Sequence, residues 1–495
     1  MTQSFTHWLG ERVLHGCAQF FEVVCQQVAR GSVLQRFRPW AGKPALQGLA
    51  WGFLVLAILG QYGMLFFPDA FLAKGKAFYE VMLYAGFFML ALHNATRGLM
   101  ILLFLLPLFT YRPLLVLLTF LLLSIVFNGV TQKRLLAALN NRFHVGVGVF
   151  LFFFLLTSLA SPGIKESLSH YFLYYVVSFV LYGVIVFLIQ TPGDLKRATL
   201  ALVLGAFLIS LYGIYQYLTL EYTSLKWVDV RSNPLLSKRA FATFENPNSF
   251  AQYLVLIIPL AFVLLWQSHS WMLRFRYAVM FGGLCLALVL TFSRGAWLAL
   301  FLGGSVLALL ISRRLFLIGL IAGAIGLNFL PDVVLDRIAS IFDAHDSSST
   351  YRFLAWKAAF SMIRDFWLTG IGADSQTFLH VYADYMINDV RVFHFHNIYL
   401  HHFVMGGILG ISGVIFLFYN SFKRLVQVMF SADGALGYIH LMAKGLFASI
   451  LALSIAGLTE DVWRQYRVDF AFWAVLALGA ATYGFATRGE YADEE

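Results

Sequence analysis

The sequence predicts an all-α membrane protein, a polytopic transmembrane bundle of about 12–14 helices with one large, partly helical loop. Two observations carry this prediction. The chain is 60% hydrophobic and only 12% charged, with a mean hydropathy of +0.76, whereas a soluble domain averages about 25% charged residues. Long apolar runs also recur from Leu46 to Thr487, most of them near the ~20 residues that a helix needs to cross a bilayer.

The net charge of +10 does not predict a nucleic-acid partner, because the basic residues are spread over short loops between apolar runs. They gather at residues 133–142, 196–197, 274–276, 313–314 and 423–424. Such groups on alternate loops follow the positive-inside rule, which places these loops in the cytoplasm. Both termini are then predicted to be cytoplasmic as well.

Fourteen apolar segments are the candidate spans, and polar residues and prolines make the count least certain between residues 93 and 113. The segments are 46–67, 77–93, 97–111, 113–130, 144–160, 170–190, 197–219, 248–266, 277–293, 295–312, 315–331, 396–418, 443–458 and 468–487.

The spans divide the chain into parts. Residues 1–44 mix aromatic and charged side chains and lack the features of a signal peptide, so we predict a cytoplasmic segment lying at the membrane interface. Residues 45–331 hold the first helices, with a loop near 220–247, and residues 332–395 form the large loop. The last helices occupy residues 396–487, before a cytoplasmic tail at 488–495. Three cysteines, without the spacing of a metal site, are predicted to be free thiols: Cys17, Cys25 and Cys285.

Within the large loop, apolar residues at helical spacing predict a helix from Tyr351 to Ile363, after a run of capping residues at 346–350. A second helix is expected from Ser375 to Asp389. Gly370-Ile371-Gly372 predicts the turn between them.

The predicted orientation places the remaining polar clusters on one side of the membrane. Both long loops, Arg294 and His396 all fall on the face opposite the basic loops. Polar groups at membrane depth point to a functional site. We therefore expect a site at the extracytoplasmic face.

Arg294 and Arg352 are candidate anion-binding residues. Arg294 lies between two apolar segments with almost no loop. It could simply extend to the lipid headgroups, but a lone arginine on this face runs against the positive-inside rule. Arg352 could be a solvated surface charge, yet near a helix N-terminus it has the wrong sign for the helix dipole. A bound phosphate would explain both positions.

His396 is the candidate general base, since an imidazole can take a proton from a hydroxyl near neutral pH. A plain interfacial histidine is the alternative. A metal site with His394, His401 and His402 is disfavoured, because no carboxylate or cysteine in the sequence pattern completes a recognisable ligand set. Asn397 could orient the histidine or bind a sugar.

The segment from Arg239 to Asn248 leads into another span. Asn-Pro is a turn signal, and Asn248 is expected to cap the following helix, which is a sufficient structural explanation. Contacts with sugar or phosphate are the functional alternative.

Four short motifs resemble those of the O-antigen ligase and polymerase superfamily of bacterial envelope glycosyltransferases. They are residues 244–254, residues 293–299, the stretch from Tyr351-Arg352 to Gly370-Ile371-Gly372, and His396-Asn397 followed after nine residues by Gly407-x-x-Gly410. Their shared order and membrane face make the set more specific than any one motif.

The resemblance implies an enzyme of the bacterial inner membrane with its active site on the periplasmic face. It implies transfer of a glycan from an undecaprenyl diphosphate carrier to a hydroxyl of lipid A-core or a similar envelope acceptor, without metal or other cofactor and with inversion at the anomeric carbon. His396, Arg294 and Arg352 match the catalytic residues of the superfamily. We expect five further residues to bind substrate: Arg239, Asn246, Asn248, Tyr351 and Asn397.

Three alternatives remain open. A polymerase of the same superfamily would use a second lipid-linked repeat as acceptor, and the motifs do not separate it from a ligase. Transfer to a protein hydroxyl is a further alternative. A transporter is disfavoured, because transporters place charged residues and broken helices near the bilayer midplane, whereas these polar residues gather at one face.

Overall fold

The computed structural model describes residues 19, 22–23, 25–26, 43–66, 75–219, 238–340, 347–431 and 437–489. In these residues the regular structure is entirely helical, which confirms the predicted fold class. Most of the expected interfacial segment at 1–44, much of the loop near 220–247, Cys17 and most of the tail lie outside the described residues. Cys25 and Cys285 are free thiols, as predicted.

Each of the 14 apolar segments falls on a helix, but fewer of these helices are long enough to span a membrane. Among the described residues ten helices qualify, or eleven if the bent pair α15 (Arg313–Leu327) and α16 (Asp332–Ala339) counts as one span. Four of the 14 segments lie on helices outside the ten: α4 (Lys76–His93), α5 (Ala95–Leu105), α8 (His144–Leu159) and α15, which counts only together with α16. The chain is nevertheless a multi-pass membrane protein.

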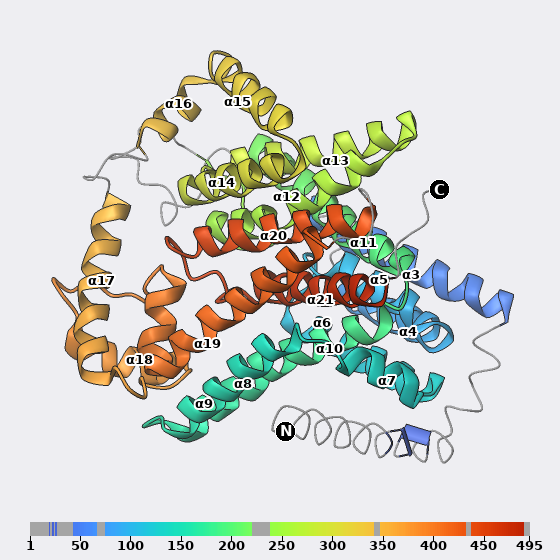
Figure 1. Cartoon of the computed structure of the whole chain (residues 1–495), viewed down its shortest axis with the longest axis horizontal. Helices are drawn as coiled ribbons and strands as arrows, with labels where there is room; N and C mark the ends of the chain where they lie inside the picture. The colour runs from blue at the N-terminus through green and yellow to red at the C-terminus, as the bar shows by residue number, and fades with distance from the viewer. Residues whose placement is uncertain are drawn as a thin grey trace. The chain divides into compact units, whose positions relative to one another are not determined.

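The chain divides into two compact units. Unit 1 comprises residues 1–142 and 183–205, and unit 2 comprises residues 143–182 and 206–495. In unit 1, α4 packs against α3 (Pro44–Phe66), α5 and α6 (Tyr111–Asn128). The short helix α7 (Gln132–Leu139) follows α6. All residues of the predicted site belong to unit 2, in the part of the chain after residue 206 that Figure 1 colours from green to red.

Unit 2 begins with α8, and the chain then continues through a series of helices and short turns. After α8 come α9 (Ile164–His170), the π-helical turn η2 (Tyr171–Val176) and α10 (Val177–Leu188); then α11 (Pro192–Thr219), α12 (Pro247–Gln267), α13 (Trp271–Leu290), α14 (Arg294–Ile311), α15 and α16; then α17 (Ser347–Phe366), α18 (Ser375–Tyr382), the 3-10 turn η4 (Ala383–Tyr385), α19 (Ile398–Met429), α20 (Tyr438–Ala456) and α21 (Tyr466–Arg488). The boundaries between the two units, at residues 182–183 and 205–206, fall within helices α10 and α11.

Burial separates the inner helices of unit 2 from the peripheral ones. In its most apolar stretch, α21 has 89% of its residues buried, against 22% in α13 and α14. Helix α20 packs against α12, α14, α19 and α21, and α8 packs along α19. At the α14–α20 contact, Gly303 meets Ala452 so closely that a methyl group at Gly303 would clash; small residues allow such approach between membrane helices.

Helix α19 is broken at Gly407, where the backbone adopts φ 57° and ψ −154°. The turn after α17 fills the break: Ile408 N donates to Trp367 O at 2.7 Å and Gly372 N to Met405 O at 2.8 Å. A Cβ on Gly407 would lie 2.4 Å from Leu368 O. Backbone groups freed in a membrane helix must find partners in the protein. The glycine motif therefore docks the large loop onto α19.

The large loop has its own apolar core. Buried residues of α17, α18 and the segment before α19 pack together, among them Met362, Phe378 and Phe395. Helix α17 matches the predicted helix at 351–363, whereas α18 is shorter than the predicted 375–389 and ends in the 3-10 turn η4. Because this core rests on the start of α19, the loop is held in a fixed position beside it.

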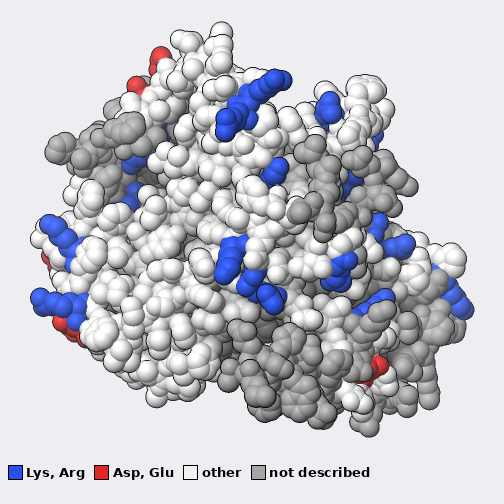
Figure 2. Space-filling view, viewed as in Figure 1, with Lys and Arg blue, Asp and Glu red and all other residues white. Residues whose placement is uncertain are grey.

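On the face drawn in Figure 2, the surface is mainly uncharged. Lys and Arg side chains are scattered singly and in small groups, and Asp and Glu side chains are few. This pattern suits a protein whose surroundings are mostly hydrocarbon. It also makes clusters of charged side chains inside the protein conspicuous.

Candidate functional site

The segment before α12 places Arg239 and Asn248 side by side. Arg239 is buried; its Nε donates to Thr291 O at 2.7 Å and one terminal nitrogen donates to Asn248 Oδ1 at 2.7 Å. Asn246 is the N-cap of α12, and its side-chain oxygen accepts from Asn248 N at 2.8 Å. The sequence predicted Asn248 as the cap, and this was wrong: the cap lies two residues earlier, because the Asn246 side chain is the one that accepts from a backbone N–H of the first turn.

The tight turn between α13 and α14 places Arg294 at the first position of α14. One of its terminal nitrogens donates to Ser340 O at 2.6 Å, just after α16. From α16 itself, Arg337 Nε donates to Phe292 O at 3.2 Å. The bend between α15 and α16 thus brings a second arginine back to the turn that carries Arg294.

Three other arginines act on Arg239 in this region. Burial and the charges of Arg337, Arg352 and Arg294 together lower the pKa of Arg239 to about 9, and Glu460 opposes this shift. Lowering an arginine pKa requires repulsion from like charges or loss of water. The described side chains therefore form a positively charged region around one buried carboxylate.

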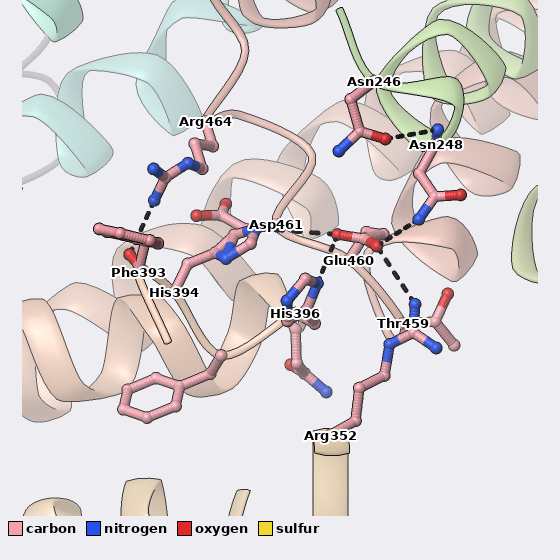
Figure 3. Close-up of polar contacts among 12 residues, drawn as sticks. Asn246, Asn248, Arg352, Phe393, His394, His396, Thr459, Glu460, Asp461 and Arg464 are labelled. Carbon is pink, nitrogen blue, oxygen red and sulfur yellow. Dashed lines mark hydrogen bonds and ion pairs between the residues drawn. The ribbon is translucent and has the colours of Figure 1, made fainter. Parts of the chain in front are cut away.

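Glu460 is the centre of the polar contacts in Figure 3, and it comes from the loop between α20 and α21. Its Oε1 accepts from Asn248 Nδ2 at 2.8 Å and from Arg352 at 3.2 Å. Its Oε2 lies 2.9 Å from His396 Nδ1 and 3.8 Å from His394 Nε2. Two of the three predicted catalytic residues, His396 and Arg352, thus meet on a carboxylate.

The charge of Glu460 fixes the proton position on His396. Burial alone would raise the pKa of Glu460, but His396, Arg352 and His394 outweigh burial and hold it well below its usual range. An ionised carboxylate can only accept, so Nδ1 of a neutral His396 carries the proton and Nε2 carries the lone pair. The side chain of His396 is 21% exposed, against 10% for Glu460. A base nitrogen on an accessible ring is therefore available to a hydroxyl.

His394, His396 and Glu460 also have the donor atoms of a metal site, since one ligand atom from each lies within 4.8 Å of the others. The sequence pattern had offered no carboxylate to complete such a set; the folded chain does. The surroundings disfavour a cation, because Arg352 already contacts Glu460 and further arginines act nearby. Two imidazoles and a carboxylate beside arginines suit proton transfer better than metal binding.

The remaining predicted substrate-binding residues lie at the site but have structural partners. Tyr351 donates its hydroxyl to Arg391 O at 2.6 Å, and its ring lies edge-on to His396 at 5.8 Å between centroids. Asn397 caps α19 with its oxygen and donates Nδ2 to Leu458 O at 3.0 Å. Asn397 therefore ties the start of α19 to the loop that carries Glu460.

Sequence reasoning missed Glu460 and Arg337. A signal for Glu460 was available, since Glu460-Asp461 is an acidic pair between two apolar segments in a chain with few acids. Nothing in the sequence distinguishes Arg337 from other loop arginines. Its role depends on the 117° bend between α15 and α16.

Residues 278–415 match the Wzy_C family model, described as O-Antigen ligase. The match takes in Arg294, Arg352 and His396, and leaves out Arg239 and Glu460. No curated protein matches the chain. The motif resemblance to the O-antigen ligase superfamily is thus confirmed over residues 278–415.

Proposed function

We propose that this protein transfers a glycan from an undecaprenyl diphosphate carrier to a hydroxyl of an envelope acceptor such as lipid A-core, at the periplasmic face of the inner membrane. One observation carries the proposal: an ionised Glu460 holds His396 and Arg352 together beside a group of arginines. This arrangement offers a base for a hydroxyl and a counter-charge for a diphosphate. The superfamily match supports the reaction class.

In the proposed reaction, His396 Nε2 takes the proton of the acceptor hydroxyl as its oxygen bonds to the anomeric carbon. The bond from that carbon to the diphosphate oxygen breaks on the opposite side, and its electron pair leaves with the diphosphate. Attack opposite the leaving group inverts the anomeric centre. The products are the new glycoside, undecaprenyl diphosphate and a protonated His396.

Each group has a defined physical task. Glu460 orients the imidazole through Nδ1 and stabilises the imidazolium as it forms, as a carboxylate does in a catalytic triad. Arg294 and Arg352 stabilise the charge that develops on the diphosphate, in an environment where fixed charges act strongly. Arg239 and Arg337 extend this positive region. General-base catalysis of this kind contributes about 10²–10⁴-fold in rate.

The test uses the full-length protein in detergent or liposomes with a defined undecaprenyl-diphosphate-linked glycan and an acceptor. Wild type should release undecaprenyl diphosphate and form the glycoside, also in the presence of a chelator. His396→Ala should abolish release. His380→Ala is the matched control, since His380 is an exposed histidine of the same loop, on α18. Turnover in His396→Ala would remove the catalytic assignment, and loss of activity with the chelator would replace it with a metal mechanism.

The same assay separates a ligase from a polymerase of the superfamily. Product on the lipid A-core acceptor identifies a ligase. A ladder of products that remains on the carrier identifies a polymerase, in which a second lipid-linked repeat is the acceptor. The residues assigned above perform the same chemistry in both cases.

A further inference from the structure

A separate cavity lies beside the catalytic groups. It has a volume of about 270 Å³ and is lined by residues of α9, η2, the start of α18, the start of α19 and the loop between α20 and α21. Neither His396, Glu460 nor the arginines of the positive region line it. Its size is near the lower end for ligand pockets, ~300 Å³. It therefore suits a single ring-sized ligand group.

Residues that line the cavity carry buried polar atoms that need partners. Asp461 is 7% exposed, and its Oδ1 makes no hydrogen bond with the described residues. The same holds for Trp463 Nε1 and His401 Nδ1, although His401 Nε2 lies 3.5 Å from Asp461 Oδ2. Buried donors and acceptors are normally satisfied, and exceptions occur where a ligand binds. Here an acceptor, a donor and an imidazole nitrogen all belong to residues that line the same cavity.

The charges of the cavity disfavour a phosphate. Two carboxylates, Asp461 and Asp469, line it with one guanidinium, Arg464. Arg464 already donates to Phe393 O at 2.7 Å and packs over the ring of Phe393. An anion would meet two like charges, whereas hydroxyl groups can both donate to Asp461 and accept from Trp463.

Aromatic walls complete the cavity. Its lining includes Tyr174, Tyr175, Phe378 and Phe393 together with the Trp463 ring. Flat aromatic faces pack against the apolar C–H face of a sugar ring, while hydroxyls at the ring edge need the polar groups described above. An uncharged sugar satisfies both kinds of surface.

We propose that this cavity binds one sugar ring of the acceptor glycan, with Asp461 and Trp463 holding its hydroxyls. This inference rests on the proposed function. Asp461 follows Glu460 directly in the chain. Figure 3 shows the Asp461 side chain directed toward Arg464, whereas the Glu460 side chain contacts Arg352 on the opposite side of the loop. Between them stands His394, whose ring centroid lies 4.0 Å from that of His396. In this proposal the acceptor sugar and the diphosphate therefore occupy opposite sides of His396 and Glu460.

Direct binding provides the first test, independent of turnover. Saturation-transfer NMR with the full-length protein in detergent would use methyl glucoside, methyl galactoside, methyl mannoside and methyl heptoside at millimolar concentration. At least one glycoside should give a signal with wild type, and Asp461→Asn and Trp463→Phe should lose it. The exposed residues Asp384 and Trp367 supply matched controls, Asp384→Asn and Trp367→Phe, which should retain it.

Steady-state kinetics provides the second test. Asp461→Asn and Trp463→Phe should raise the acceptor KM by about tenfold, the loss expected for one buried hydrogen bond, and leave the donor KM unchanged. Trp463→Phe keeps an aromatic ring at this position and removes the N–H donor, so it tests the hydrogen bond separately from Asp461.

The outcomes separate the cavity from the proposed function. A wild type that turns over donor but binds none of the glycosides would overturn the inference, and so would variants that raise the donor KM instead. Glycoside binding that the variants abolish, in a protein with no transfer from the diphosphate donor, would support the sugar site and overturn the proposed function.

Discussion

Glu460→Gln separates the charge of Glu460 from its shape. The amide retains the size of the side chain but offers one acceptor oxygen and one NH₂ donor. In the wild type, Oε1 accepts from Asn248 and Arg352, and Oε2 faces His396 Nδ1. The amide oxygen should take the position with two donors, because the reverse orientation would leave two donors facing NH₂.

This orientation changes the tautomer of His396. With NH₂ facing Nδ1, that nitrogen must act as an acceptor, and the ring proton moves to Nε2. The lone pair needed by the acceptor hydroxyl is then lost from the accessible nitrogen. We expect kcat to fall by about 10²–10⁴-fold, the range for losing a correctly oriented general base.

The assay is release of undecaprenyl diphosphate by Glu460→Gln, His396→Ala and the double variant. If Glu460 acts through His396, the double variant should be no slower than His396→Ala, because residues that act as a unit are not additive. Wild-type turnover in Glu460→Gln, or losses that multiply in the double variant, would refute the reasoning.

A stability measurement checks the same charge. Because the pKa of Glu460 is lower in the folded protein, the folded state binds this proton less tightly than the unfolded state does. The ionised carboxylate therefore contributes stability that is fully present above its ordinary pKa of 4.5 and is lost as the pH falls below that value. Glu460→Gln should lack this acid-dependent loss. A buried partner removed from an ion pair costs ~3–5 kcal/mol, and we expect less here because Arg352 and His396 are partly exposed.

Three further predictions follow from the same contacts. Arg352→Lys keeps the charge but loses the planar fork, so kcat should fall by about 10–100-fold; equal rates would show that only the charge of Arg352 matters. Gly407→Ala should prevent stable folding, measured by size-exclusion chromatography and thermal unfolding, because its Cβ would meet Leu368 O, whereas Gly304→Ala, at an open position on α14, should be tolerated; a well-folded Gly407→Ala variant would contradict the docking of the loop. Burial raises the pKa of Asp461, so its ionised form destabilises the fold at neutral pH and Asp461→Asn should raise the thermal midpoint there but not below pH 3.8; a lower midpoint at neutral pH would contradict this.

The helices were predictable because each one carries a local signal. Every apolar segment of the sequence became a helix, and the turn at Gly370–Gly372 lies where the two glycines indicated it. Fewer described helices than predicted segments have the length of a full span, because hydropathy does not register helix length: α5 has 11 residues and α8 has 16. Many apolar side chains of α5 and α8 are buried against other parts of the protein, so their hydropathy does not come from lipid contact alone.

The site was predictable only in part. His396, Arg294 and Arg352 stood out because charged and polar residues are rare at the ends of apolar segments. Glu460, which pairs with both His396 and Arg352, lies 64 positions after His396 and 108 positions after Arg352 in the chain. The periodicity of a sequence does not predict contacts over such distances. The cavity was not predictable at all, because its polar atoms come from separate helices and loops.

Backbone conformation explains why this site can hold its charges in place. Four of the six described non-glycine residues with positive φ lie in the loops of the site: Ala242, Glu245, Phe292 and His396. Such conformations cost about 1–3 kcal/mol each and persist only where neighbouring contacts enforce them. One enforcing contact is Gln216, whose Oε1 accepts from the backbone of Phe241 and Ala242 at 3.1 and 2.9 Å. The loop that carries Arg239 is thus held in its strained conformation by a helix side chain. Catalysis by fixed charges needs this rigidity, since the charges must be in position before the diphosphate begins to leave.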